Sequence, residues 1–127
     1  YQAENGTASA GSILNETTNA GGTPGTNGPY VNTNNAVGAW WEITVNVASA
    51  GTYSLDFRFA NGGTADRPAD IRVNGVVVQS ALSFPITGWT TWSDVIVSKT
   101  LNAGNNTIRL TATTANGCAN LDKLTVQ

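Results

Sequence analysis

Side chains that carry oxygen are the groups in this sequence that could bind a metal ion or transfer a proton. The chain has eight Asp and Glu residues, no His and a single cysteine, Cys118. Zinc, haem and iron–sulfur sites need His or several Cys, and Ser–His–Asp or Cys–His catalysis needs a His base. The composition therefore excludes these sites. It leaves calcium, which prefers carboxylate, amide and carbonyl oxygens, as the metal to consider.

Three side chains that carry such oxygens lie near the two chain ends. Gln2 and Glu4 fall on one face of a strand predicted over residues 1–7, and Asp122 lies in the last predicted strand. If the two terminal strands are neighbours, these three side chains converge and could hold calcium together with loop carbonyls. On the residues alone, a solvated surface is the stronger interpretation.

Aromatic residues in polar loops are the second feature with chemical potential. Tyr30 follows Asn27-Gly28-Pro29, where no core face is defined. An exposed ring there could offer a flat apolar platform to the C–H face of a pyranose, or it could pin its own loop to the protein. Trp89 and Trp92 share the loop before the strand over residues 94–101. We expect one of the two to be buried and the other exposed, and the sequence does not say which.

Charged residues are few, and no pair of them predicts catalysis. Arg67 lies in an irregular stretch, where it could bind a carboxylate or form a local bridge to Asp66 or Asp70. Glycosidases need two carboxylates fixed across a cleft. Nothing in this short chain fixes such a pair, so we expect no enzymatic activity.

The charge balance and hydropathy exclude two partner classes. Six scattered Lys and Arg residues and a net charge of −2 argue against nucleic acid, and no apolar run is long enough for a membrane helix. Asn (15) and Thr (18) are abundant while Lys and Glu are scarce, as in many secreted bacterial proteins. We expect a mature piece of an extracellular protein.

Strand-type alternation recurs along the chain, and helical spacing is not sustained anywhere. Residues 52–60 and 40–47 alternate apolar and polar side chains, with Trp41, Tyr53, Phe57 and Phe59 on the core side. Asn74-Gly75 between two Val-rich runs predicts a hairpin. Further strands are expected over residues 1–7, around 8–15, and over 94–101, 107–113 and 121–126. Residues 15–39 and 61–69 are expected to be long irregular stretches.

About eight to ten short strands and no helices predict one all-β domain over residues 1–127. The architecture expected is a two-sheet antiparallel β-sandwich of the jelly-roll type.

An ordered set of short motifs resembles carbohydrate-binding modules of families 35 and 6, with family 35 favoured. The motifs are Gln2-Ala-Glu4, Gly28-Pro-Tyr-Val-Asn32, Ala39-Trp-Trp-Glu-Ile43, Gly51-Thr-Tyr-Ser-Leu55, Val73-Asn-Gly75, Thr87-Gly-Trp-Thr-Thr-Trp92, Gly104-Asn-Asn-Thr-Ile108 and Asn120-Leu-Asp-Lys-Leu124. They span nearly the whole chain. The resemblance implies a non-catalytic, monomeric module that targets an appended enzyme to plant or microbial polysaccharide.

The resemblance also implies which residues bind. It assigns a structural calcium to Gln2, Glu4 and Asp122. It places the sugar site in loops at one end of the sandwich, with Tyr30, Arg67, Trp89 or Trp92, and Asn120.

The favoured ligand is a uronic acid, of the glucuronic acid or unsaturated galacturonic acid type. It would be bound with a second calcium near Asn35 and Asn120. The role of Glu16, which lies in the insertion over residues 15–27, stays open.

Two alternatives remain at this point. One is binding of neutral β-glucan or xylan chains, as in family 6. The other is a β-sandwich for protein interaction or adhesion.

Overall fold

The computed structural model describes residues 1–18 and 29–127. These residues form ten strands and one short 3₁₀-helix, Ala3–Asn5, and they include no helix that could cross a membrane. The strands are β1 (Thr7–Ala8), β2 (Ile13–Glu16), β3 (Tyr30–Asn32), β4 (Trp40–Val47), β5 (Gly51–Ala60), β6 (Ala69–Val73), β7 (Val76–Leu82), β8 (Ser93–Leu101), β9 (Gly104–Ala112) and β10 (Asn120–Val126).

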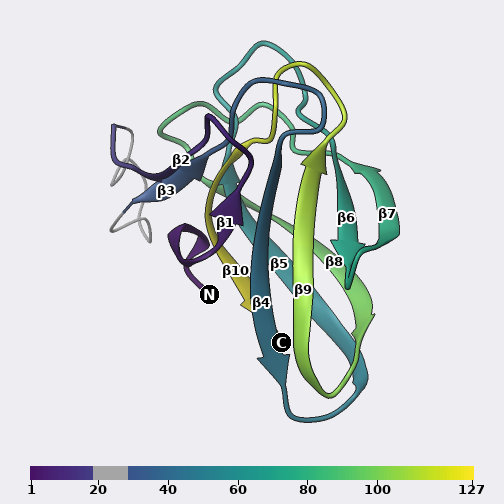
Figure 1. Ribbon diagram of the computed structural model, residues 1–127. Helices are drawn as coiled ribbons and strands as arrows, with labels where there is room; N and C mark the ends of the chain where they lie inside the picture. The colour runs from purple at the N-terminus through teal and green to yellow at the C-terminus, as the bar shows by residue number, and fades with distance from the viewer. Residues whose placement is uncertain (19–28) are drawn as a thin grey trace.

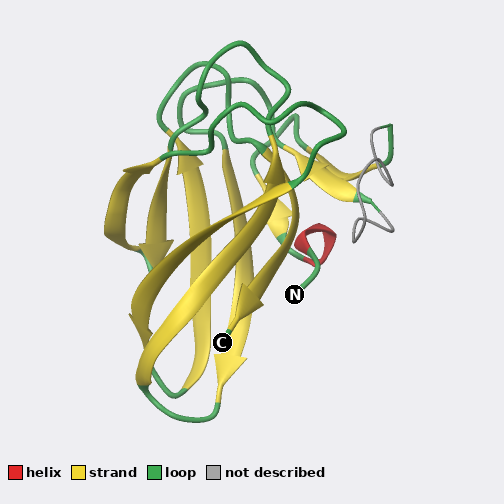
Figure 2. Ribbon diagram, turned by 180° about the vertical axis from the view of Figure 1, so that it is seen from behind, coloured by secondary structure: helices red, strands yellow, loops and turns green. Residues whose placement is uncertain are grey.

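Two five-stranded sheets face each other and confirm the predicted β-sandwich (Figure 1). One sheet has the order β1-β4-β9-β6-β7 and the other the order β2-β3-β10-β5-β8. Neighbouring strands are antiparallel throughout. The longer loops gather at one end of the sandwich (Figure 2).

The core lies between the sheets and follows the alternation of the sequence. Trp41 from β4 and Phe57 and Phe59 from β5 are buried as predicted. The Phe84 ring meets the rings of both phenylalanines edge-on, at centroid distances of 6.3 and 5.1 Å. Tyr53 is only half-buried, because its hydroxyl reaches out to donate to the Ser49 carbonyl (2.7 Å).

The hairpin between β6 and β7 forms where Asn74-Gly75 predicts it. Both residues have positive φ angles, +52° and +83°, which suits the primed turns that match strand twist. The Asn74 side chain also accepts a hydrogen bond from the Thr107 amide (2.9 Å) and donates one to Asn106 Oδ1 (3.0 Å). The turn is thereby fixed to the neighbouring strand.

The N-terminal strand predicted over residues 1–7 is wrong. The pairing of this segment with the last strand is limited to one bridge, Gln2 opposite Lys123, and the chain then curls into the 3₁₀-helix. The curl buries Ala3, whose carbonyl accepts a hydrogen bond from the indole N–H of Trp41 (2.8 Å). A straight strand would not bring that carbonyl to the buried indole.

The stretch over residues 15–39 is more ordered than predicted. It contains the end of β2 and all of β3, and Tyr30 belongs to a strand instead of a loop. Residues 19–28 of this stretch lie outside the described residues, and with them most of the insertion over residues 15–27 that contains Glu16. The second long stretch, between β5 and β6, is a loop as predicted.

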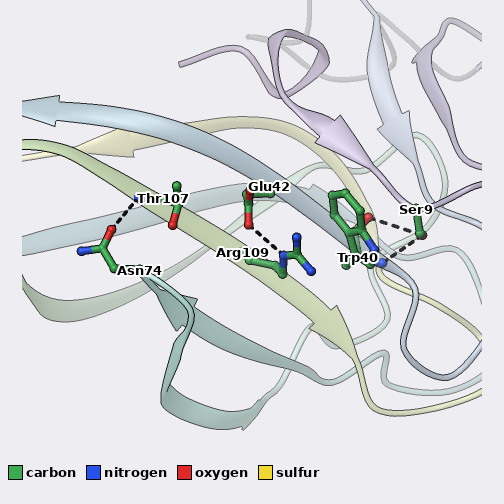
Figure 3. Close-up of polar contacts among 6 residues, drawn as sticks. All are labelled: Ser9, Trp40, Glu42, Asn74, Thr107 and Arg109. Carbon is green, nitrogen blue, oxygen red and sulfur yellow. Dashed lines mark hydrogen bonds and ion pairs between the residues drawn. The ribbon is translucent and has the colours of Figure 1, made fainter.

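The outer face of the β1-β4-β9-β6-β7 sheet carries a polar layer (Figure 3). The Arg109 guanidinium lies 4.0 Å from the centroid of the Trp40 ring and donates to Glu42 (2.8 Å). Ser9 Oγ accepts from the Trp40 amide (3.0 Å), which ties the chain after β1 to β4. These contacts stabilise strand pairing on this face and cover part of the Trp40 ring.

Candidate functional site

A small pocket lies at the loop end of the second sheet, on its outer face. Val31 and Leu121 point into the core, so Tyr30, Asn32 and Asn120 point outward. The pocket measures about 190 Å³. Its lining residues come from β2 and the segment directly after it, from β3 and β10, and from the loop before β8: Glu16, Thr18, Tyr30, Asn32, Trp89 and Asn120.

The structure decides between the two tryptophans of the 87–92 loop. Trp92 is 5% exposed and packs in a small cluster with Tyr30 and Ala60, separate from the main core. Trp89 is 37% exposed and lines the pocket. Strand alternation cannot be extended back through this loop, because Gly88 has a φ of +115° and turns the chain.

Tyr30 forms a wall of the pocket and is not an open platform. It is 1% exposed, and its ring meets the Trp92 ring edge-on at 5.3 Å and 63°. The two interpretations of Tyr30, a sugar-binding ring and a ring that pins its own loop, are therefore each partly right. The ring lines the pocket, and it also anchors its own segment. Among the aromatic residues that line the pocket, Trp89 is the exposed one.

Arg67 lies against Trp89 and outside the pocket lining. Its guanidinium carbon is 5.1 Å from the centroid of the indole ring, and Nη1 donates to the Cys118 carbonyl (3.3 Å). The expected alternative bridges do not form: Asp66 accepts from the Phe84 amide, and Asp70 accepts from the Ala81 amide. Burial lowers the pKa of Arg67, which nevertheless stays cationic at neutral pH.

Asn120 places an unsatisfied acceptor at the pocket. It opens β10 opposite Ala60 and is 2% exposed. Its Oδ1 has no hydrogen-bond partner in the part of the chain that the structure describes. Leaving a buried acceptor unpaired costs about 1–3 kcal/mol, so this atom is poised to accept a hydrogen bond or to bind a cation.

Glu16 brings a negative charge to the same pocket. It pairs with Tyr30 across β2 and β3, and its Oε1 accepts from Thr18 Oγ1 (2.6 Å) and from the Thr17 and Thr18 amides (3.0 and 3.1 Å). These hydrogen bonds, led by the Thr18 hydroxyl, lower the pKa of Glu16. Sequence reasoning left this residue without a role. The Glu-Thr-Thr sequence, which favours such local bonds, was the available signal.

Asn35 lies apart from the pocket. It lines a separate hollow of about 280 Å³ with Gly11, Ile13, Thr33 and Asn34, and Asn32 borders both hollows. The structure therefore does not bring Asn35 into the pocket of Asn120. Glu16, Thr18, Tyr30 and Asn32 are the oxygen-bearing side chains that line that pocket with Asn120.

The chain ends form a second cluster of oxygen donors. Tyr1 and Leu124 exchange backbone hydrogen bonds, both 2.9 Å, so the terminal segments are neighbours, which is the condition that the calcium hypothesis set. Asp122 lies at an irregularity in β10 and is 3% exposed. Burial raises its pKa, as does the Glu4 carboxylate, although the cations of Lys123 and Arg58 oppose the shift.

Within the described residues, Glu4 Oε2 is buried without a hydrogen-bond partner. The same residues hold no group of three or more His, Cys, Asp or Glu side chains arranged for a metal. A cation near Gln2, Glu4 and Asp122 would thus also need amide or carbonyl oxygens. An orphaned carboxylate oxygen beside a second buried carboxylate fits such an ion chemically.

Comparison with known proteins gives a consistent result. The family model "Carbohydrate binding module (family 6)" matches residues 2–127. An exo-β-D-glucosaminidase of Amycolatopsis orientalis is 46% identical over 127 residues, which are 99% of this chain and 12% of that protein. Endo-1,4-β-xylanase B of Cellvibrio japonicus is 42% identical over 99 residues, 76% of this chain and 16% of the xylanase. The chain thus spans a small part of these enzymes.

Solved structures agree with the sequence comparisons. A family 35 carbohydrate-binding module from Clostridium thermocellum is 46% identical with a TM-score of 0.89, covering 99% of this chain and 94% of that one. Xyl-CBM35, solved in complex with a glucuronic acid containing disaccharide, is 38% identical with a TM-score of 0.79, covering 89% and 81%. These relatives are binding domains, and the chain belongs with them: it is a non-catalytic carbohydrate-binding module of the group that unites families 6 and 35.

Proposed function

We propose that this module binds a uronic acid unit of a polysaccharide, of the glucuronic acid or unsaturated galacturonic acid type, in the pocket beside Trp89, together with calcium. The observation that carries the proposal is the set of residues that line this one pocket. It combines an exposed indole ring, an unsatisfied buried acceptor on Asn120 and the carboxylate of Glu16.

Trp89 and Asn120 suit a pyranose ring. The exposed part of the indole offers a flat apolar surface for the C–H groups of a sugar. Asn120 Oδ1, which lacks a partner among the described atoms, can accept from a sugar hydroxyl. The pocket of about 190 Å³ suits one sugar unit better than a long segment of chain.

Calcium enters the proposal because of charge. A uronate carboxylate next to the Glu16 carboxylate would place two negative charges in one small pocket, which is unfavourable without a cation. Carboxylate and amide oxygens are the ligands that calcium prefers, and Glu16, Asn32 and Asn120 supply them. Support also comes from Xyl-CBM35, whose solved complex contains a glucuronic acid disaccharide.

Neutral β-glucan or xylan is the second candidate ligand. The xylanase relative favours it by name, and the Trp89 surface would serve a neutral xylose unit equally well. The two candidates differ in their need for the cation. A neutral sugar has no carboxylate for the ion to bridge.

A separate structural calcium is proposed at the chain ends, held by Gln2, Glu4 and Asp122. It is supported by the buried, partnerless Glu4 Oε2 and by the neighbouring Asp122, both described above. A divalent cation there would offset the repulsion between the two carboxylates. It would also join the N-terminal segment to β10.

The biological role proposed is targeting. As a secreted, monomeric module joined to a catalytic domain, it would hold that domain on plant or microbial polysaccharide and raise its local concentration. The enzymes that contain related segments support this role. Size-exclusion chromatography with light scattering tests the monomer.

Calorimetric titration tests the ligand. Glucuronic acid and a xylo-oligosaccharide are titrated separately, each with calcium and again after chelation. The proposal expects binding of glucuronic acid that is lost on chelation. Binding of the neutral chain alone would replace it with the family 6 type of ligand. No binding in any titration would contradict the proposal and favour a protein-interaction role.

A further inference from the structure

The Trp89 ring is held by a neighbouring loop, residues 61–67, as well as by its own. We infer that Gly62 and Arg67 of this loop are positioning residues, which fix the indole as a preformed wall of the sugar pocket. The inference rests on the proposed function, because it assigns a purpose to the ring's orientation. Neither residue lines the pocket.

Gly62 lies directly against the indole. A Cβ atom built on this residue would lie 2.3, 2.3 and 2.5 Å from Cδ2, Cγ and Cδ1 of Trp89. Three such similar distances to adjacent atoms of the five-membered ring place the Gly62 backbone over its face. Gly62 does not have a positive φ, so glycine is required here by space and not by backbone conformation.

Arg67 contacts the same indole from the other end of the loop. Its guanidinium lies 5.1 Å from the ring centroid, a distance at which cation and ring attract each other. The side chain is 8% exposed and is anchored by the bond from Nη1 to the Cys118 carbonyl. Because none of its described contacts is with a carboxylate, its role is best explained by the ring.

Asn61 makes the supporting loop rigid. It is completely buried, and its Nδ2 donates to the carbonyls of Ala65 (3.0 Å) and Phe84 (2.9 Å). Its backbone carbonyl accepts from the amides of Thr87 (2.8 Å) and Gly88 (3.0 Å). The loop that carries Gly62 and the loop that carries Trp89 are therefore joined immediately before the tryptophan.

This arrangement has a consequence for binding. A ring that is already fixed loses little conformational freedom when a sugar packs on it, so more of the contact energy contributes to affinity. Moving the ring should weaken binding even though no residue of the pocket lining is changed.

The test uses Gly62→Ala, with Gly51→Ala as its matched control. The added methyl group at position 62 must push the ring by about 1 Å to reach an ordinary 3.4 Å contact, whereas at position 51 the nearest atom is already 3.9 Å away. Arg67→Met removes the guanidinium and keeps a long side chain. Trp89→Phe identifies the contribution of Trp89 to the near-ultraviolet circular dichroism and to acrylamide quenching.

We expect Gly62→Ala and Arg67→Met each to change the Trp89 signal of the free protein and to weaken glucuronic acid binding at least fivefold, with cooperative unfolding retained. Gly51→Ala should match the wild type in both measurements. An unchanged Trp89 signal in Gly62→Ala would overturn the inference. Lost binding with an unchanged signal in Arg67→Met would make Arg67 a direct ligand instead.

Failure of the proposed function looks different from failure of this inference. If the proposed function is wrong, the wild-type protein itself does not bind the sugar. The Trp89 signal of the free variants still reports whether the loop positions the ring.

Discussion

Two buried asparagines offer a sharp test of the site, because one is satisfied and the other is not. Asn120 is 2% exposed, with an Oδ1 that has no partner among the described residues. Asn106 is 1% exposed at the opposite end of the sandwich and is fully engaged. Its Nδ2 donates to the Asn102 and Gly104 carbonyls, and its Oδ1 accepts from the Asn102 amide and from Asn74 Nδ2.

Asn120→Ala should weaken binding strongly and spare the fold. Truncation loses packing worth about 1 kcal/mol but also removes an unpaired acceptor that costs about 1–3 kcal/mol. The free energy of unfolding should therefore change by less than about 1 kcal/mol, or about 4 °C in Tm for a domain of this size. A lost contact to a charged ligand or ion costs about 1.5–3 kcal/mol, so affinity should fall by about 10- to 150-fold.

Asn106→Ala should give the opposite result. Four hydrogen bonds at about 1 kcal/mol each, reduced because they are not additive, predict a loss of about 3 kcal/mol and a Tm about 12 °C lower. Sugar affinity measured below the transition should be unchanged, since Asn106 is far from the pocket.

Differential scanning calorimetry and isothermal titration of both variants make the comparison. The reasoning would be refuted if Asn120→Ala bound like the wild type. It would equally be refuted if Asn120→Ala lost as much stability as Asn106→Ala.

Three further predictions concern packing, pH and metal. Trp89→Ala should abolish binding at a smaller cost to stability than Tyr30→Ala, because Trp89 is 37% exposed and Tyr30 is buried. Tyr30→Ala empties a buried site beside Trp92 and should lower the unfolding free energy by about 3–5 kcal/mol; equal Tm values for the two variants would contradict the assigned burial. Burial, followed by the nearby Asp94, raises the pKa of Asp56, so the folded state favours the protonated carboxyl. The contribution of Asp56 to the free energy of unfolding is therefore fully present below pH 3.8 and is lost as the pH rises through the folded pKa. Asp56→Asn should therefore be more stable than the wild type at pH 7 and lose that advantage at pH 3, and an advantage independent of pH would refute this cause. Calcium should raise the wild-type Tm and chelation should lower it, while Asp122→Asn should lose most of this response. A full response in the variant would show that the structural ion binds at another place.

The sandwich could be predicted because its signals are local. Alternation along β4 and β5 fixes which side chains face the core, and Asn74-Gly75 fixes a hairpin through the positive φ angles that these residues tolerate. The meeting of the chain ends was only a condition of the calcium hypothesis, and the backbone hydrogen bonds between Tyr1 and Leu124 fulfil it.

The site could be predicted only in part, because its decisive features depend on long-range contacts. Alternation fails at Gly88, so it could not show that Trp92 is covered by Tyr30 while Trp89 is open. Whether Asn120 Oδ1 has a hydrogen-bond partner depends on the groups that β5 and the loops place around it. The curl at Ala3 depends on the buried indole of Trp41, which lies far along the chain.

The most direct test of the central claim locates the sugar by NMR. Glucuronic acid is titrated, with calcium, into ¹⁵N-labelled protein while the four indole N–H signals are followed, with that of Trp89 assigned through Trp89→Phe. The account predicts a saturable shift of the Trp89 signal and a constant signal from Trp41, whose indole is buried and bonded to the Ala3 carbonyl. Saturable binding that shifts Trp40, on the outer face of the other sheet, and leaves Trp89 unchanged would contradict it.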